Sequence, residues 1–481
     1  MVNGERISPT DTTWLRMDRP TNPMVITGVL VLEGPIDFER LAATIASRLL
    51  NFARLRQRVE EGLTGFWWVS DDNLSVSRHI KRTRLPGRGG HAELECFVAD
   101  LASQSFDPAH PLWQCHVVED YDGGAAVVAR VHHAVADGLA LIALMLSLTD
   151  PVPEVATQDR TDVPCAIDVG VNTQGQGFLT PLTSLVGEGL GILDKVGREV
   201  LARGTDPQKA LKDSLNIAGE LAYLLLMPED SPSIFRGKPR GEKRVAWTDP
   251  LELAEIKAIS RALGCRVNDM LLCAVAGALR SYLLGKGEQT DGVELRTFVP
   301  VNLRTEEESG DLGNIFGIVA VELPVGVENP LSRLYELHRR MEALKQSYEP
   351  AVTLGLIMAL GYAPHQLQDQ IFHFLSSKAT AVMTNVPGPQ HPRYLAGSRV
   401  KQVMFWVPQS YDIAMGISIL SFDGKVQFGI MTDAAIVLDP GEIIDKIGPE
   451  FEQLLYFVLM APWGESNDLE TDLFTREGRE P

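Results

Sequence analysis

The sequence is short of positive charge. It has 44 Lys and Arg residues against 63 Asp and Glu residues, which gives a net charge of −19 at pH 7. Proteins that bind nucleic acid cover phosphate groups with clustered Lys and Arg, so this balance argues against a nucleic-acid partner. It argues equally against attachment to anionic lipid by charge alone.

Cysteine and long hydrophobic runs are scarce as well. The five cysteines form no Cys-x-x-Cys pair, so we expect reduced core thiols; they are Cys96, Cys115, Cys165, Cys265 and Cys273. The first residues lack the apolar core of a signal peptide. Apolar runs such as residues 221–227 fall short of the ~20 residues that span a bilayer. We therefore expect a cytoplasmic protein that associates peripherally with a membrane.

The length exceeds what one hydrophobic core usually serves. A chain of 481 residues, 45% hydrophobic and 22% charged, predicts two globular domains. Pro, Asp, Thr and Gly accumulate from residue 150 to residue 176, which predicts a linker. The expected division is an N-terminal domain over 1–177, a helical and loop connection over 178–242, a C-terminal domain over 243–463 and an acidic, disordered tail over 464–481.

Several elements are predicted from local patterns. Residues 24–32 are rich in Val, Ile and Leu and predict a buried strand, and Asp37 then predicts the start of an amphipathic helix. The pair Asp249-Pro250 predicts another helix start. The pair Asp423-Gly424 lies between two strand-like runs and predicts a hairpin turn.

The segment from Val131 to Gly138 contains the candidate catalytic residues. A strand ends in two histidines, and a turn and an apolar helix follow. Neutral imidazole can take a proton from an alcohol near pH 7. Adjacent residues at a strand end point to opposite faces, so only one of His132 and His133 can enter a given cleft. Asp137 suits a turn whose carboxylate organises the loop. The same residues are also compatible with an ordinary hydrogen-bonded loop, because Asp-Gly is common in turns.

The spacing His-His-x-x-x-Asp-Gly resembles the signature of the CoA-dependent acyltransferase superfamily. Further motifs narrow the resemblance to the wax ester synthase/diacylglycerol acyltransferase family. They occur in the same order as in that family, from about residue 7 to about residue 460. These motifs are Ser8 to Leu15, Asn22-Pro23-Met24, Phe106-Asp107, Pro111-Leu112-Trp113, Val267-Asn268-Asp269, Val299 to Arg304, Gly313-Asn314 and Asn385 to Pro389. The chain departs from the family at residues 71–88, which lack a usual Phe-Asp pair, and this departure concerns substrate preference.

The resemblance implies an α/β fold of two similar chloramphenicol-acetyltransferase-like domains, with a substrate tunnel at their interface. It implies that His133 is the general base and that His132 supports the loop. Asp137 would organise the turn with Arg304 as its partner, and Gly138 would leave room for the substrate or adopt a positive φ. The thiolate of CoA is a good leaving group, so the reaction requires neither a metal nor an acyl-enzyme, and acyl-CoA is a co-substrate rather than a cofactor.

The same resemblance supplies the expected substrate-binding residues. Asn268 either caps its helix or turns its amide into the tunnel, and Asp269 belongs to the same motif. Asn385 begins a proline-rich stretch that would form a rigid crossover or a tunnel wall. The set is completed by Pro111, Leu112 and Trp113.

We therefore expect an O-acyltransferase that esterifies diacylglycerol or a long-chain alcohol with fatty acyl-CoA, at a membrane or lipid-droplet surface. The lipid contact is predicted in residues 221–227 and the basic residues that follow. Two alternatives stay open. One is a condensation-type or polyketide-associated acyltransferase that depends on a carrier protein. The other is an inactive protein that binds lipid or coats droplets.

Overall fold

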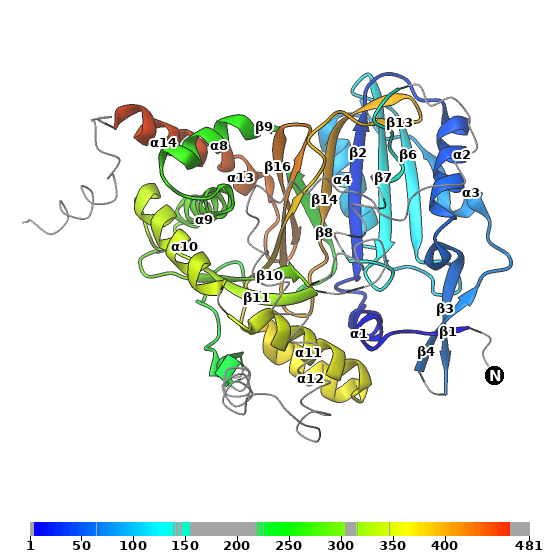
Figure 1. The fold of residues 1–481 in the computed structure, drawn as a ribbon, viewed down its shortest axis with the longest axis horizontal. Helices are drawn as coiled ribbons and strands as arrows, with labels where there is room; N and C mark the ends of the chain where they lie inside the picture. Colours follow the sequence, from blue (N-terminus) through cyan, green and yellow to red (C-terminus); the bar gives the residue numbers. More distant parts are fainter. Residues whose placement is uncertain are drawn as a thin grey trace, which may run out of the picture.

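The computed structural model describes residues 4–63, 65–137, 147–153, 226–303, 316–345 and 347–461, together with 140, 144, 219–220, 222–224 and 314. Within these residues the chain forms two large sheets with helices against them, one sheet in each half of the view in Figure 1. The predicted linker and tail lie almost entirely outside the described residues. A small third sheet, ordered β1-β4-β3, and short helical turns complete the first half; they are β1 (Glu5–Arg6), η1 (Ala53–Arg56), β3 (Gln57–Gly62), β4 (Gly65–Ser70) and α3 (Val76–His79).

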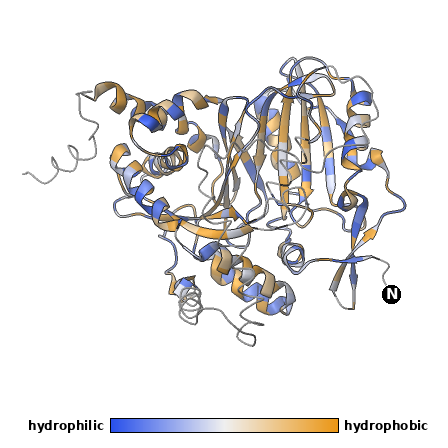
Figure 2. Cartoon of the chain, in the orientation of Figure 1, coloured by the Kyte–Doolittle hydropathy of each residue, from blue (hydrophilic) through white to orange (hydrophobic). Residues whose placement is uncertain are grey.

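The first large sheet has the strand order β13-β14-β2-β7-β6-β5. Every residue of β2 is buried, because helices or the second half of the chain cover both faces of the sheet. Figure 2 shows this part of the sheet as largely hydrophobic. Asp37 caps α2 as predicted, with its carboxylate accepting from the Glu39 and Arg40 N–H groups. The elements are β2 (Val25–Leu32), α2 (Phe38–Leu49), β5 (Ile80–Thr83), α4 (His91–Ala102), β6 (Trp113–Tyr121), β7 (Gly124–His132), β13 (Tyr394–Leu395) and β14 (Ser398–Trp406).

The second large sheet has the order β11-β10-β12-β15-β16-β8, and β9 pairs with β16. The pair Asp423-Gly424 forms the predicted hairpin turn, with φ of 47° and 74°. Helices α8, α9, α10, α13 and α14 lie on the outer side of this sheet in Figure 1. The strands are β8 (Lys243–Trp247), β9 (Leu251–Glu252), β10 (Leu295–Asn302), β11 (Phe316–Leu323), β12 (Ala381–Pro387), β15 (Met415–Phe422) and β16 (Lys425–Asp433). The helices are α8 (Leu253–Ala262), α9 (Val267–Gly285), α10 (Pro330–Leu344), α13 (Gly441–Ile444) and α14 (Ile447–Met460).

Helix α9 is long and apolar enough to cross a membrane by length and composition alone. It is, however, 78% buried and packs against α8, α10 and α14 in the main hydrophobic cluster of the second half. Its apolar character therefore reflects its place in the core.

Strand β14 links the two halves. It lies within the predicted C-terminal domain but pairs with β2 in the first sheet. Val403 and Phe405 pack on one face of that sheet and Met404 and Trp406 on the other, so both faces of the strand are buried. The pairing of β13 and β14 with the first sheet therefore crosses the predicted boundary at residue 243.

Two local predictions need correction. The helix predicted to start at Asp249-Pro250 begins at Leu253, because Leu251 and Glu252 pair with β16 before the chain turns into α8. Cys96 is exposed rather than in the core. It lies two residues after Leu94 on α4, on the side away from the buried Leu94 and Val98. Cys115 and Cys273 are buried, and Cys165 lies outside the described residues.

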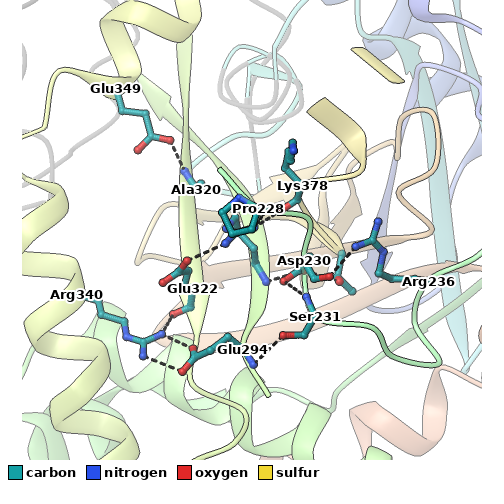
Figure 3. Close-up of polar contacts among 12 residues, drawn as sticks. Pro228, Asp230, Ser231, Arg236, Glu294, Ala320, Glu322, Arg340, Glu349 and Lys378 are labelled. Carbon is teal, nitrogen blue, oxygen red and sulfur yellow. Dashed lines mark hydrogen bonds and ion pairs between the residues drawn. The ribbon is translucent and has the colours of Figure 1, made fainter. Parts of the chain in front are cut away.

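The segment that leads into the second half lies against the end of its sheet. In Figure 3, Asp230 and Ser231 lie beside β10, and Glu294 faces Arg340 of α10. The Asp230 carboxylate accepts from the Arg296 N–H at 2.8 Å and from the Thr380 hydroxyl at 2.6 Å. Residues 228–236 are therefore anchored to strand backbone by buried charge-assisted hydrogen bonds.

The apolar run at residues 221–227 is partly internal. Leu224 and Met227 are buried with Ala320 of β11 and Val352, whereas Tyr223 and Leu226 are exposed. Leu221 and Leu225 lie outside the described residues. The prediction that the whole run contacts lipid is therefore wrong for Leu224 and Met227, because the sheet edge already covers them.

Helix α1 (Pro9–Met17) joins the halves below the sheets in Figure 1, where it packs on α11 (Glu349–Tyr362), which α12 (His365–Ser376) follows. The Thr13 hydroxyl donates to the Ile357 carbonyl at 3.1 Å. A Cβ on Gly361 would lie 2.0 Å from the Pro9 carbonyl oxygen, so only glycine allows this close approach. This contact sets the position of α1, which forms one wall of the site described next.

Candidate active site

The histidine loop begins where β7 ends, between two neighbouring strands. The His133 N–H donates to the Met24 carbonyl at 2.7 Å, just before β2, and the His132 N–H donates to the Leu112 carbonyl at 3.0 Å, just before β6. The Val135 N–H closes a turn onto the His132 carbonyl at 2.9 Å. Because β2 and β6 flank β7, the main chain of both histidines is held from both sides.

The two rings have different surroundings. His132 is 2% exposed, and its Nδ1 accepts from the Ala134 N–H at 3.0 Å. Its Nε2 lies 3.7 Å from a carboxylate oxygen of Asp18, whose other oxygen accepts from the Met24 N–H at 2.8 Å. The His132 ring is thus held within the loop, in the arrangement expected of a supporting residue.

The His133 ring packs against two aromatic side chains that also stack on each other. It stacks on Trp14 of α1 with centroids 4.4 Å apart and planes 24° apart, and the Phe316 ring lies 5.8 Å away. Burial lowers the pKa of His133 to about 4, so the ring is neutral at pH 7. Its Nδ1 is buried without a hydrogen-bond partner in the described part of the chain. A neutral ring in an aromatic slot is able to accept a proton.

Both halves contribute to this slot through one amide. Asn314, just before β11, donates from Nδ2 to the Asp11 carboxylate of α1 at 2.8 Å and to the His133 carbonyl at 2.9 Å. Burial raises the pKa of Asp11, while hydrogen bonds from Asn314 and Ser8 oppose that shift. The site therefore needs α1 from the first half and the start of β11 from the second.

The turn after the histidines is organised by Asp137. The Asp137 carboxylate is 4% exposed and accepts from the Ala140 N–H at 2.9 Å, as a helix-capping carboxylate does. Gly138 and Arg304 lie outside the described residues. The pairing of Asp137 with Arg304 and the role of Gly138 stay predictions.

The asparagines predicted to bind substrate meet each other. Asn385 of β12 donates to Asn268 Oδ1 at 2.8 Å, at the start of α9. Arg266, not Asn268, is the N-cap of α9. Asp269 is buried, accepts from the Arg266 N–H at 3.0 Å and lies 2.7 Å from His338 Nδ1 of α10. The two amides can thus act as one polar unit, whereas the Asp269 carboxylate stabilises the helix start.

The Pro111-Leu112-Trp113 motif lies at the start of β6. Leu112 and Trp113 are buried, and Trp113 Nε1 donates to the Leu55 carbonyl at 2.8 Å. The His79 ring stacks on Trp113 at 4.6 Å. Since the Leu112 carbonyl holds the His132 N–H, the motif supports the histidine loop; its contact with substrate stays a prediction.

Four residues of this site were missing from the predicted set: Asp11, Trp14, Asn314 and Phe316. Asp11 and Trp14 are three residues apart on α1 and so share a helix face, a spacing readable in the motif Ser8 to Leu15. Asn314 belongs to the predicted motif Gly313-Asn314. What the sequence does not reveal is that these segments meet, because 303 positions separate Asn314 from Asp11.

The described residues contain no group of three or more His, Cys, Asp or Glu side chains that could hold a metal ion. The His133 ring itself is a buried, neutral imidazole that packs against Trp14 and Phe316.

Comparison with known proteins gives a consistent result. The family model "Wax ester synthase/diacylglycerol acyltransferase catalytic domain" matches residues 7–271, and the model "WS/DGAT C-terminal domain" matches residues 312–455. A probable diacylglycerol O-acyltransferase of Mycobacterium tuberculosis is 27% identical over 429 residues, which cover 87% of this chain and 89% of that protein.

Solved structures share the fold. A wax ester synthase/diacylglycerol acyltransferase from Marinobacter aquaeolei VT8 is similar with a TM-score of 0.69 and 21% identity, over 95% of this chain and 100% of that chain. The first condensation domain of the calcium-dependent antibiotic synthetase is similar with a TM-score of 0.60 and 13% identity, over 95% of this chain and 96% of that domain. The two-domain α/β architecture is therefore that of the chloramphenicol-acetyltransferase-like fold.

Proposed function

The chain belongs to the wax ester synthase/diacylglycerol acyltransferase family, and we propose that it transfers a long-chain fatty acyl group from acyl-CoA directly to the hydroxyl of diacylglycerol or of a long-chain alcohol, with His133 as general base. The observation that carries this proposal is the buried, neutral His133 ring, which packs against Trp14 and Phe316 where the two halves of the chain meet.

In the proposed reaction, His133 alone carries the proton of the acceptor hydroxyl to the CoA thiolate. The neutral ring takes the proton of the acceptor hydroxyl as the oxygen attacks the thioester carbonyl. The tetrahedral oxyanion then collapses, the carbon–sulfur bond breaks and the CoA thiolate takes the proton from the imidazolium. Each hydrogen-bond donor to the oxyanion is worth about 3 kcal/mol.

The predicted site residues receive proposed roles on this basis. Asp137 organises the histidine turn, with Gly138 and Arg304 as its expected companions. The pair Asn268 and Asn385 supplies polar contacts to the substrate in a tunnel between the halves, as the family resemblance implies. Pro111, Leu112 and Trp113 complete the substrate side and hold the loop through the Leu112 carbonyl.

The names of similar proteins support both acceptors. The Mycobacterium tuberculosis relative is named a probable diacylglycerol O-acyltransferase, and the matching family model names wax ester synthase as well as diacylglycerol acyltransferase. The condensation domain is 13% identical and so supports the fold alone, which leaves the carrier-protein alternative without support of its own. Because both proposed acceptors partition into lipid, we also propose that the protein acts in the cytoplasm at a membrane or droplet surface.

The test is a direct assay of ester formation. Purified protein receives labelled palmitoyl-CoA with either diacylglycerol or hexadecanol, and thin-layer chromatography separates the products. We expect labelled ester and an equal amount of free CoA thiol. A folded protein that yields no ester with any long-chain acceptor would contradict the proposal and favour the lipid-binding alternative. A strong preference for acyl-carrier protein over acyl-CoA would replace the proposed donor.

A further inference from the structure

The main-chain carbonyl of His133 is held by a side chain from the other half of the molecule. The His133 N–H donates to the Met24 carbonyl, which lies just before the neighbouring strand β2. The carbonyl instead accepts from Asn314 Nδ2, which is 181 positions away. The peptide groups on both sides of the ring are therefore fixed, one by the sheet and the other by a single amide.

That amide is itself anchored. Asn314 Nδ2 has two hydrogens, and they go to the His133 carbonyl and to the Asp11 carboxylate. Asp11 is 5% exposed and lies on α1, whose N-cap Ser8 accepts from the Asp11 N–H at 3.0 Å. The direction of the amide is thus determined by a buried carboxylate on a capped helix.

The aromatic contacts follow the same division. Trp14 lies three residues after Asp11 on α1, and Phe316 lies two residues after Asn314 in β11. Each element therefore gives one polar and one aromatic side chain, and the two aromatic rings stack at 5.5 Å. The hydrogen bonds between Asp11, Asn314 and His133 set where the two rings stand around the imidazole.

The amide oxygen of Asn314 is the remaining group. It is buried without a hydrogen-bond partner in the described part of the chain, as is His133 Nδ1. With both Nδ2 hydrogens in use, this oxygen is the only part of the amide that can favour a positively charged ring. The Asn314 side chain indeed opposes the lowered pKa of His133. A buried acceptor beside the base is suited to the imidazolium that forms during acyl transfer.

We propose that Asn314, anchored on Asp11, is a positioning residue that holds the His133 carbonyl and thereby orients the ring against Trp14 and Phe316. This inference rests on the proposed role of His133 as base. Asn314 acts through His133: its Nδ2 holds the main-chain carbonyl of that residue, and its side chain also favours the charged form of the ring.

The first test is Asn314→Ala, with kcat and KM for palmitoyl-CoA measured separately. We expect kcat to fall about 10- to 100-fold and KM to change less than about threefold, because the ring loses its orientation while the binding surfaces remain. Asn329→Ala is the matched control: Asn329 caps α10 with its side chain and contacts no residue of the site. That control should lower the melting temperature but leave kcat unchanged.

The double variant D11N/N314D separates positioning from mere stability. It exchanges donor and acceptor, so a hydrogen bond between positions 11 and 314 can still form, but a carboxylate then faces the His133 carbonyl. We expect a melting temperature no lower than that of Asn314→Ala, because the bond between positions 11 and 314 survives. We also expect a kcat as low as that of Asn314→Ala and an acidic limb of the pH profile that moves upward.

The outcomes distinguish this inference from the proposed function. If the double variant restores kcat to within threefold of wild type, Asn314 only joins α1 to β11 and the inference is wrong. If Asn314→Ala keeps full kcat while His133→Ala is inactive, the inference fails and the function stands. If Asn314→Ala and His133→Ala both stay active, the assignment of His133 as general base fails. Should Asn314→Ala not fold, the double variant decides alone.

Discussion

Two adjacent histidines in this loop are separated by what surrounds each ring. His132 is engaged by the Ala134 N–H and lies near Asp18. His133 instead stacks on Trp14, and its Nδ1 is buried without a hydrogen-bond partner in the described structure. A ring that serves the loop should matter for stability. A ring that accepts a proton should matter for turnover.

His133→Ala should therefore lower kcat by about two to four orders of magnitude, the range of a lost general base, with little change in melting temperature. His132→Ala should lower the melting temperature more and kcat less, because it removes the acceptor of the Ala134 N–H. Steady-state kinetics and thermal unfolding of both variants check this. Greater loss of kcat in folded His132→Ala would reverse the two roles.

The pH profile should show the buried ring. Burial lowers the pKa of His133 to about 4 from its ordinary 6.5, so the neutral, active form persists above about pH 4. We expect kcat/KM to stay level from pH 8 to pH 5 and to fall as the pH approaches 4. In the unfolded chain this histidine binds its proton near its ordinary pKa of 6.5, whereas in the folded protein it does so only near 4. The free energy of unfolding therefore decreases as the pH drops from 6.5 towards 4. An acidic limb of kcat/KM between pH 6 and 7 would contradict this environment.

Elements α1, β11 and α11 form one unit in which backbones touch. Gly361 of α11 meets the Pro9 carbonyl of α1, and a Cβ on Gly317 of β11 would lie 1.9 Å from the Pro350 carbonyl of α11. Such contacts transmit small displacements, because packed backbone cannot yield locally. The position of Trp14 therefore depends on α11, although α11 contributes no hydrogen bond to the histidines.

Gly361→Ala should push α1 away from α11. Overpacking of this kind costs about 1–3 kcal/mol, and kcat should fall as well because α1 carries Asp11 and Trp14. Gly448→Ala on α14 is the control, since a Cβ there meets nothing within 4 Å and alanine favours a helix. Thermal unfolding and kcat are measured for both variants. Equal stability and turnover of the two would show that α1 is free to shift.

Because the net charge is −19, we expect contact with lipid to be apolar. The described residues expose apolar side chains at several places, among them Tyr223, Leu226 and the end of α14. At residues 219–226, the inner side chain Leu224 belongs to the core, while Tyr223 and Leu226 are 44% and 82% exposed. Burial of each such side chain in an interface contributes about 1.5–3 kcal/mol, which suits reversible attachment.

Vesicle flotation tests this attachment. Wild type should float with neutral as well as anionic vesicles, and Leu226→Asp with Tyr223→Asp should reduce flotation with both. Leu438→Asp is the matched control, because Leu438 is 67% exposed in the loop between β16 and α13, apart from the exposed apolar residues at the end of α14. Flotation that needs anionic lipid, disappears in high salt and survives the double substitution would show electrostatic attachment instead.

Much of the chemistry was readable from the sequence because it depends on neighbouring residues. Asp37 caps its helix and Asp423-Gly424 turns its hairpin, since caps and turns act within a few positions. Strand β7 ends at His132, so the histidine pair lies at a strand end as predicted. The ordered motifs were enough to indicate the family, and the family models agree.

Other features were decided only when distant segments met. The sequence by itself could not show that β14 would join the first sheet, that Asp269 would turn to His338, or that Asn314 would hold the His133 carbonyl. Each of these features depends on which groups form hydrogen bonds in the core and which apolar faces pack together. The residues involved are far apart along the chain. Local physics therefore determined the histidine loop and its chemistry, whereas tertiary packing decided which ring lies in the aromatic slot and what orients it.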